Sequence, residues 1–274
     1  MNFDSNTTAT STKKNPPSSA EVSHWNAIWA NKQPRLLDVK AILSTQDPLR
    51  KAFYASIGEV KNLNVLDLGC GDGELSVLLA LLGANVTALD TSEQAINSTR
   101  ELALANGVGE KMTYHAGEFS TLRPAAPFDL LTGVFVLHHI EPFDQFCREL
   151  KLAIRPGGRG VFIENNGRNP LLMLARKYLT GRFGIPRYGD NSEYPFEPRE
   201  LDLLRTTLGQ ADYLIPQLIF FRKLNTYIFR HKPIFKPLMK LNDFFDLAAY
   251  QLLPFMRKYS YQQIILFSRS LTPP

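Results

Sequence analysis

The stretch VLDLGCGDGE, residues 65–74, decides the fold of this chain of 274 residues. Its apolar first half predicts a buried strand over residues 64–68, and a helix is expected from Glu74 to Leu82. The glycines between them allow a tight turn and let a ligand approach the backbone. Because backbone N–H groups and the helix dipole gather at such a turn, the stretch predicts a ligand site at the end of the first strand.

Short apolar runs alternate with helical stretches after this turn. The predicted strands are residues 64–68, 85–89, 112–115, 128–134 and 160–164, and the predicted helices between them are residues 74–82, 91–106 and 143–154. A capping box at Thr91–Gln94 marks the start of the second helix. The alternation predicts an α/β fold, with a doubly wound parallel sheet covered by helices on both faces. Two more strands are expected at residues 211–221, where Pro216 requires a sheet edge, and at residues 261–268.

The composition is that of an ordinary globular chain, with 44 % hydrophobic and 21 % charged residues. Cys70 and Cys147 are the only cysteines, which excludes a disulfide framework, and no CxxC spacing points to a bound metal. No apolar run reaches the roughly 18 residues of a membrane-spanning helix. Together these features favour a reducing, cytoplasmic location.

Charge is distributed unevenly along the chain, whose net charge is +5. Residues 1–154 carry 13 Lys and Arg against 17 Asp and Glu, whereas residues 155–274 carry 18 against 9. A basic half of this kind is compatible with binding to nucleic acid or to an anionic membrane, and the charge alone does not distinguish between these partners.

Two aspartates narrow the class of ligand. Asp90 ends the second predicted strand, 17 residues after Gly73. At this place an acidic side chain can accept hydrogen bonds from both hydroxyl groups of a ribose. The glycine spacing does not fit the G-x-G-x-x-G of dinucleotide sites, and Asp67 would repel a pyrophosphate. A nicotinamide dehydrogenase is therefore disfavoured. Asp67 suits a cationic ligand instead, such as the sulfonium or amino group of S-adenosylmethionine.

Four segments occur in an order and spacing that identify a family resemblance. They are VLDLGCGDGELS at residues 65–76, VTALD at 86–90, FDLL and VLHHI within 128–140, and IRPGGRGVFIE at 154–164. The chain resembles the class I S-adenosylmethionine-dependent methyltransferases, in particular the small-molecule, quinone-pathway-like enzymes. The resemblance implies a Rossmann-like, seven-stranded sheet in the order 3-2-1-4-5-7-6 with strand 7 antiparallel. It also implies methyltransferase activity with S-adenosyl-L-methionine as the cofactor.

The resemblance assigns cofactor contacts to individual positions. Asp67, Gly69, Gly71 and Gly73 would surround the methionine moiety, Asp90 would bind the ribose, Glu118 and Phe119 would contact the adenine, and Gly133 and Val134 would contribute backbone to the methionine amine. The family more often has Asp where this chain has Glu118, which makes that position a departure from the pattern.

Two neighbouring histidines after the fourth predicted strand are candidates for a catalytic base. Related small-molecule enzymes carry a histidine where His139 stands, and His138 precedes it. A base is needed only if the acceptor is protonated at working pH. The alternative is that the histidine only hydrogen-bonds within the fold. Glu164, at the end of the fifth predicted strand, is a further polar candidate for the acceptor site; the alternative is that it only caps the following loop.

The regions outside the resemblance are expected to shape the acceptor site. We predict a disordered tail at residues 1–22 and N-terminal helices at 23–60 that cover the site, one of them with Asp47 as its N-cap and Pro48 as its first residue. A methyltransferase domain is predicted at 61–274, with lid insertions at about 166–210 and 222–258. Trp25, Trp29 and Tyr188 are the candidate acceptor contacts. This aromatic content indicates a hydrophobic acceptor, such as a quinone-like, alkaloid or other secondary metabolite. Basic residues on apolar helices also permit peripheral membrane contact.

Two other functions remain open from the sequence. An RNA or protein methyltransferase could dock its substrate through the basic C-terminal half. However, the Asn/Asp-Pro-Pro-aromatic motif of base amino-methyltransferases is replaced by Thr132–Phe135, so no nucleic acid is expected. A non-catalytic nucleoside-binding protein is the third possibility. The oligomeric state cannot be predicted.

Overall fold

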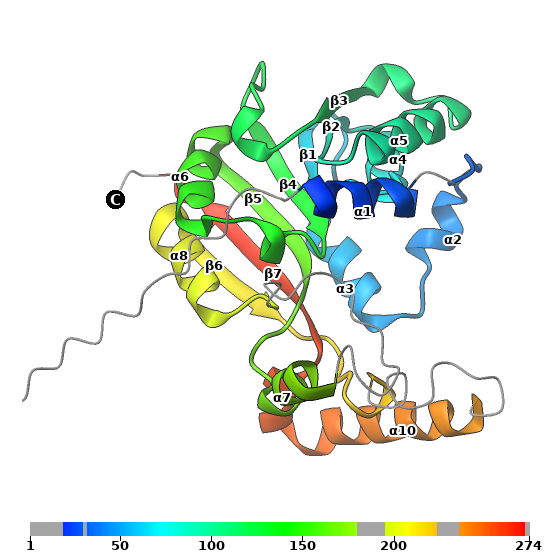
Figure 1. Ribbon diagram of the computed structural model, residues 1–274, viewed down its shortest axis with the longest axis vertical. Helices are drawn as coiled ribbons and strands as arrows, with labels where there is room; N and C mark the ends of the chain where they lie inside the picture. The colour runs from blue at the N-terminus through cyan, green and yellow to red at the C-terminus, as the bar shows by residue number, and fades with distance from the viewer. Residues whose placement is uncertain (1–18, 30–31, 180–194, 224–235, 272–274) are drawn as a thin grey trace, which may run out of the picture.

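The computed structural model describes residues 19–29, 32–179, 195–223 and 236–271. Within these residues lies a seven-stranded sheet in the order β3-β2-β1-β4-β5-β7-β6 (Figure 1). The strands are β1 (Asn64–Leu68), β2 (Asn85–Asp90), β3 (Met112–Ala116), β4 (Phe128–Val134), β5 (Ile154–Asn165), β6 (Gly209–Leu214) and β7 (Gln262–Arg269). The first five pair in parallel, and β7 runs antiparallel to both β5 and β6. The predicted strand order and the antiparallel seventh strand are confirmed.

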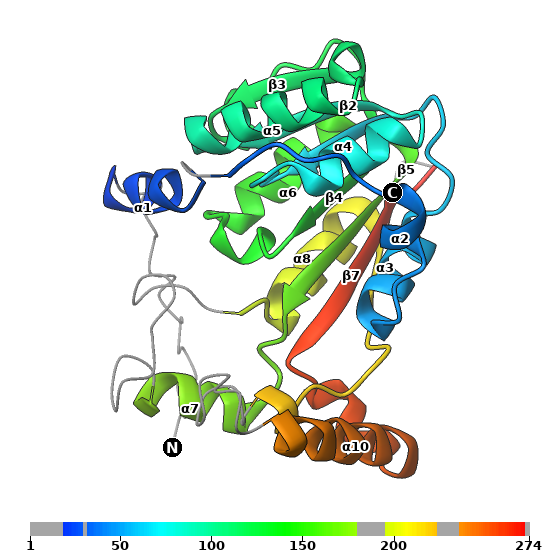
Figure 2. The same ribbon diagram turned by 90° about the vertical axis from the view of Figure 1, so that its right-hand side faces the viewer.

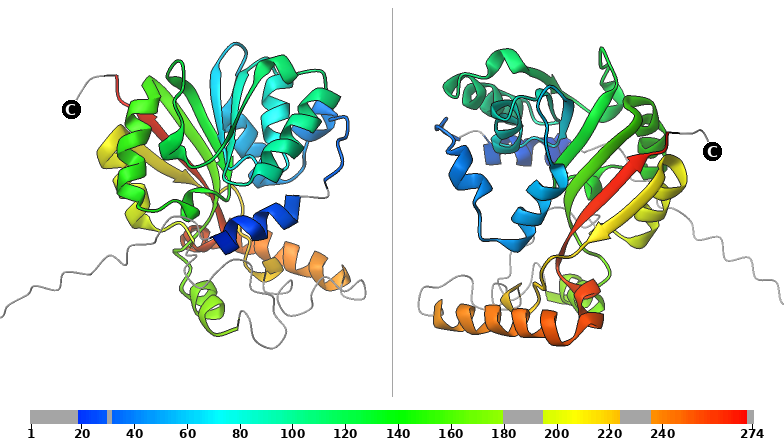
Figure 3. Two further views of the ribbon diagram at one scale, coloured as in Figure 1. Left: turned by 45° about the horizontal axis from the view of Figure 1, so that its top comes forward. Right: turned by 180° about the vertical axis from the view of Figure 1, so that it is seen from behind.

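Helices cover both faces of the sheet. The described α-helices are α1 (Ser19–Trp29), α2 (Val39–Leu43), α3 (Pro48–Ile57), α4 (Glu74–Leu81), α5 (Glu93–Ala105), α6 (Phe143–Ala153), α7 (Pro170–Leu179), α8 (Pro198–Leu208) and α10 (Lys236–Leu252). Short 3-10 helices are η1 (Gly109–Lys111), η2 (Phe119–Thr121), η3 (Leu137–His139) and η5 (Pro254–Tyr259). Figure 3 shows helices on both sides of the sheet. Neighbouring residues of β1 point to opposite faces: Val65 packs in the cluster with α3, α4 and α5, and Leu66 in the cluster with α6 and α8.

Side-chain caps fix where the helices begin. Asp47 accepts a hydrogen bond from the Arg50 amide, 2.9 Å away, so α3 begins at Pro48 as predicted. The predicted capping box at Thr91–Gln94 is wrong, because the cap of α5 is Ser92, whose Oγ accepts from the Ala95 amide at 3.1 Å.

Several boundaries differ from the sequence prediction. The chain becomes helical at Ser19, within the predicted disordered tail, and residues 1–18 lie outside the described part. Helix α2 was not predicted; Asp38 caps it by accepting from the Ala41 amide at 2.9 Å. Strand β5 begins at Ile154 because its first residue already pairs with Phe128, ahead of a register shift. Strand β6 ends before Pro216, whose ring nitrogen cannot donate to a sheet ladder.

Two helices stand away from the sheet. Helices α7 and α10 lie beyond the end at which β5 leaves the sheet (Figures 1 and 2). Helix α8 falls inside the predicted lid insertion at 166–210, but its residues Leu201, Leu204 and Leu208 are buried in the core beside α6, so this part is core rather than lid. Among the described helices, none combines the length and the apolar character that crossing a membrane requires.

Candidate active site

A cavity of about 930 Å³ opens at the carboxyl ends of β1, β2 and β4. Strand order reverses between β1 and β4, and ligands of open α/β sheets bind at such a reversal. The ends of the strands and the turn after β1 form its floor, and Trp25 and Trp29 of α1, together with residues of α3, contribute to its wall. The volume lies within the range of small-molecule and cofactor sites.

The glycine turn between β1 and α4 packs closely on its neighbours. Gly69 has φ +68°, and a Cβ there would lie 2.6 Å from a methyl carbon of Val136. Gly73 has φ +80°, and its Cβ would lie 2.7 Å from the Cα of Thr99 on α5. Gly69 and Gly71 line the cavity, whereas Gly73 does not. The expectation that Gly73 contacts a ligand is therefore replaced by a packing role, which lets α4 approach α5.

Asp67 and Asp90 both line the cavity, as the sequence predicts. Asp67 is buried and accepts a hydrogen bond from Ser76 Oγ at 2.5 Å. Burial is the main cause that raises its pKa to about 7, and the neighbouring Asp90 adds to the rise. Asp90 accepts from the amides of Gly71 at 3.0 Å and Ser92 at 2.9 Å, and burial raises its pKa as well.

The opposite side of the cavity carries the residues predicted to contact an adenine. Glu118 precedes η2 and is exposed, and Phe119 packs edge-on against Phe146 with ring centroids 5.0 Å apart. Val134 lines the cavity at the end of β4. Gly133 is buried and does not line it, because its Cα faces the Leu68 carbonyl and a Cβ there would lie 2.5 Å from that oxygen.

The two histidines after β4 have different surroundings. His139 lines the cavity, and its ring lies edge-on to Trp25 with centroids 5.8 Å apart. His138 is buried outside the cavity, where its Nδ1 lies 2.6 Å from Oε2 of Glu164. Glu164 is fully buried and also lies outside the cavity, so the expectation that it faces an acceptor is wrong. Its carboxylate oxygens instead accept hydrogen bonds from the Val136 and Leu137 amides and contact His138, all in the loop after β4.

Helix α1 lies over the glycine turn and carries two tryptophans that line the cavity. The Trp25 and Trp29 rings are nearly parallel, with centroids 6.5 Å apart and planes inclined by 13°. The Trp29 ring lies against Gly71, where a Cβ would be 3.1 Å from the ring. Tyr188, the third predicted acceptor contact, lies outside the described residues. The described parts of α7, α8 and α10 do not line the cavity.

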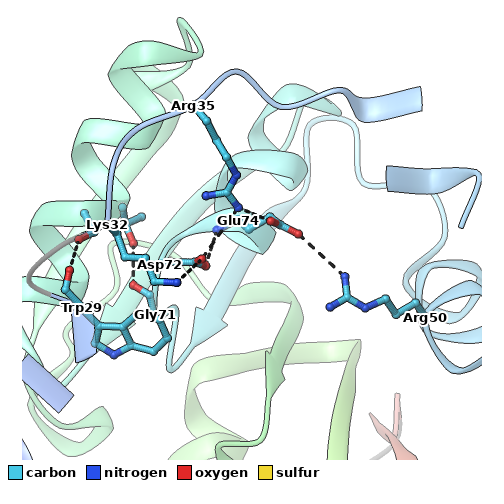
Figure 4. A network of polar contacts seen from close by, with 9 residues as sticks. Trp29, Lys32, Arg35, Arg50, Gly71, Asp72 and Glu74 are labelled. Carbon is cyan, nitrogen blue, oxygen red and sulfur yellow. Dashed lines mark hydrogen bonds and ion pairs between the residues drawn. The ribbon is translucent and has the colours of Figure 1, made fainter. Parts of the chain in front are cut away.

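Ion pairs fasten the segment after α1 to the start of α4 (Figure 4). Lys32 Nζ lies 3.8 Å from Oδ2 of Asp72, and the Arg35 guanidinium pairs with Glu74. Glu74 also faces Arg50 of α3, with 4.0 Å between Nη1 and Oε1. Glu74 lies in the first turn of α4, where its negative charge also interacts favourably with the positive end of the helix dipole.

The sequence analysis expected N-terminal helices at 23–60 to cover the site, but it singled out no residue of α3 as a contact. Arg50 and Tyr54 line it from successive turns of that helix, together with Phe53. The start of α3 was predicted, but nothing in the sequence indicated which face would turn toward the site. Spacing of four residues along a helix, with Arg50 and Tyr54 on one face, is the signal that could have suggested a shared role.

Carboxylates outnumber basic side chains in the cavity wall, with Asp72 and Glu74 already paired to Lys32, Arg35 and Arg50. Its carboxylates are Asp47, Asp67, Asp72, Glu74, Asp90, Glu118, Glu141 and Glu149. Among the described residues, Arg50 is the one Lys or Arg side chain that lines it. Such a wall suits a ligand that carries positive charge together with a single anionic group.

Comparison with known proteins links this site to methyl transfer. Residues 65–158 match a family described as a methyltransferase domain. A ubiquinone biosynthesis O-methyltransferase of Bordetella avium is 29 % identical over 192 residues, which cover 66 % of this chain and 76 % of the relative. A protein of the same name from Bordetella pertussis is 31 % identical over 161 residues, covering 57 % of this chain and 64 % of the relative.

Solved structures share the fold at low sequence identity. The [4+2]-cyclase SpnF has a TM-score of 0.58 at 14 % identity, covering 95 % of this chain and all of that one. A putative sarcosine dimethylglycine methyltransferase from Galdieria sulphuraria has a TM-score of 0.55 at 12 % identity, covering 91 % of this chain and 98 % of that one. These similarities concern the fold alone, which hosts more than one reaction.

Proposed function

We propose that this chain, a class I S-adenosylmethionine-dependent methyltransferase, methylates an oxygen atom of a hydrophobic small molecule. The observation that carries this proposal is the position of His139, which lines the cavity beside the Trp25 ring. Relatives named as O-methyltransferases of ubiquinone biosynthesis support oxygen as the acceptor atom and a quinone-like ring as its carrier. A nitrogen acceptor of similar shape is the alternative.

The residues of the cavity fit the cofactor by charge. S-Adenosylmethionine combines a sulfonium and an ammonium with one carboxylate, which matches a wall of carboxylates with a single arginine. We assign Asp67 and the Gly69 backbone to the amino group and Arg50 to the carboxylate. Gly71 lines the cavity with its backbone, and its missing Cβ makes room for the Trp29 ring.

The remaining assignments follow the strand ends. Asp90, at the end of β2, would accept the ribose hydroxyls. Glu118 would accept from the adenine amino group, and Phe119 would lie against the ring. Val134 would contribute backbone near the methionine. When bound, the cofactor supplies an electrophilic methyl group on sulfur, so the protein contributes mainly alignment and the exclusion of water.

An acceptor hydroxyl must lose its proton as it is methylated. A phenol has a pKa of about 10, so it is protonated at neutral pH and a base assists its reaction. His139 is placed for this role, since it lines the cavity near the end of β4. Trp25 and Trp29 offer nearly parallel aromatic faces, which suit a flat, apolar ring.

We also propose that the enzyme meets its lipophilic acceptor at a membrane surface. One side of α10 exposes Leu241 by 47 %, Phe244 by 61 % and Leu252 by 76 %. The exposed Lys240 and Lys258 lie on α10 and η5 beside them. Exposed apolar side chains with basic neighbours are typical of peripheral contact with anionic lipid.

Vesicle co-sedimentation tests the membrane contact. The full chain should bind vesicles of phosphatidylcholine with phosphatidylglycerol more strongly than pure phosphatidylcholine vesicles. Phe244→Asp should reduce that binding, whereas Leu104→Asp should not, because Leu104 is equally exposed but lies on α5. Equal binding of both variants would argue against this face of α10.

Transfer of a labelled methyl group tests the acceptor class. Protein, an extract of the source cells and S-adenosylmethionine labelled in its methyl group are incubated together, and organic-soluble and macromolecular fractions are counted separately. Label in the organic fraction is the expected result, and mass spectrometry of the product then separates oxygen from nitrogen. Label in RNA or protein would replace the small-molecule proposal by substrate docking on the basic C-terminal half. Cofactor binding without any transfer would favour a nucleoside-binding protein.

A further inference from the structure

A single buried carboxylate organises the loop that follows β4. Oε1 of Glu164 accepts hydrogen bonds from the amides of Val136 at 2.9 Å and Leu137 at 2.6 Å. Oε2 lies 2.6 Å from Nδ1 of His138. Glu164 has no exposed surface, and the His138 side chain is 7 % exposed. A carboxylate kept from water in this way is stable only when such donors replace its hydration.

The loop needs an anchor because its backbone leaves the strand sharply. Phe135 has φ +56°, a left-handed conformation that is unusual for a residue other than glycine. Its amide still pairs with the Ile163 carbonyl of β5 at 2.8 Å. The next two amides would then have no strand partner, and Glu164, one residue beyond Ile163, accepts both of them.

Two parts of the active site depend on where this loop lies. Val136 packs against Gly69, so the loop supports the glycine turn after β1. His139 ends η3, and its ring centroid lies 4.2 Å from that of His138. The anchored segment therefore carries both a wall of the cofactor cavity and the histidine assigned as the base.

We infer that Glu164 and His138 form a positioning pair that holds His139 at the cavity, an inference that rests on the proposed function of His139. A carboxylate only accepts hydrogen bonds, so its contact places a proton on Nδ1 of His138 and fixes the tautomer of that ring. The ring so held lies against His139 and limits its orientation. Glu164 and His138 act through His139 and touch neither cofactor nor acceptor.

The pair can be examined by nitrogen-15 NMR of the histidine side chains in the full chain, without any acceptor. The chain has five histidines, and His138→Asn and His139→Gln assign the two relevant rings. The wild type should carry a proton on Nδ1 of His138. Glu164→Gln keeps an oxygen for the two loop amides but presents an amide donor to His138, so the Nδ1 proton should vanish and the His139 signals should move.

Activity supplies the second readout, using the product identified in the labelling experiment. Glu164→Gln should lower kcat about tenfold, with the Kd for S-adenosylhomocysteine changed less than about threefold, because a small displacement of a catalytic group lowers the rate by about 10- to 100-fold. His138→Asn should lower kcat in the same direction. Thr132→Val is the matched control, since it removes a buried hydrogen bond from β4 to the Val161 carbonyl of β5 and should change neither kcat nor the His139 signals.

The outcomes separate this inference from the proposed function. A wild-type His138 protonated on Nε2, or unchanged His139 signals in Glu164→Gln, would overturn the positioning pair. An Nδ1 proton that vanishes in Glu164→Gln with moved His139 signals supports it. If His139→Gln itself kept full activity, the base assignment would fall, while the same NMR result would still support the pair.

Discussion

The Asp90 carboxylate accepts a hydrogen bond from the Gly71 amide, with 3.0 Å between Oδ2 and the nitrogen. The end of β2 is thereby tied to the glycine turn after β1. The residue assigned to the ribose also supports the turn that would surround the methionine moiety. Substitutions at Asp90 must therefore separate ligand binding from the integrity of the turn.

Asp90→Asn is expected to weaken binding of S-adenosylhomocysteine by about 10- to 100-fold, the range of one or two lost charge-assisted hydrogen bonds. Its single amide oxygen can accept from the Gly71 amide or from the Ser92 amide but not from both, so the melting temperature should fall slightly. Asp90→Ala should lose the same affinity and melt lower as well. Calorimetry and thermal denaturation measure the two effects, and unchanged affinity in Asp90→Asn would remove the ribose assignment.

Arg50→Met tests the assignment of the cofactor carboxylate. The variant should bind S-adenosylhomocysteine at least tenfold more weakly, because it loses a charge-assisted hydrogen bond. Methylthioadenosine has the same nucleoside but no amino-acid group, so its affinity should stay within about twofold. Calorimetry with both ligands gives the comparison. An equal loss for both ligands would mean that Arg50 only supports the fold, for example through Glu74.

The pKa of Asp67, raised to about 7 by burial, predicts a pH-dependent stability. Between pH 4 and 7 the folded state holds a proton that the unfolded state has lost, so this group makes the free energy of unfolding fall as pH rises. Across this pH range the free energy of unfolding should fall by up to about 4 kcal/mol because of this group. Asp67→Asn should remove it, which urea denaturation at several pH values can measure. Parallel pH profiles of wild type and variant would contradict the raised pKa.

Much of the fold could be predicted because local and global signals agree. The glycine turn, the apolar runs and the cap at Asp47 all favour the same alternation of strands and helices, whereas the cap predicted at Thr91 lies one residue later, at Ser92. The contacts among the site residues could not be predicted in the same way. Glu164 could be placed at a strand end, but its burial depends on the path of the loop after β4.

The position of Gly73 shows the same limit. Its motif predicts a ligand contact, but the structure turns it toward Thr99. Gly73→Ala should lower the free energy of unfolding by about 2 to 4 kcal/mol, since it adds a clash to an unfavourable φ. Gly107→Ala is the matched control, because Gly107 has φ +70° but nothing within 4 Å of an added Cβ. Gly107→Ala should lower the free energy of unfolding by about 1 kcal/mol. If Gly73→Ala and Gly107→Ala lowered it equally, the packing role of Gly73 would be contradicted.

His139 is assigned as the group that takes the acceptor proton in this cavity. This assignment is tested by measuring kcat for wild type and His139→Gln with the acceptor identified from the organic fraction, together with the Kd for S-adenosylhomocysteine. In His139→Gln, kcat should fall by about 10²- to 10⁴-fold, the usual contribution of a general base, and the Kd should stay within about threefold. A folded variant that keeps wild-type kcat would contradict the assignment and leave alignment as the source of the rate.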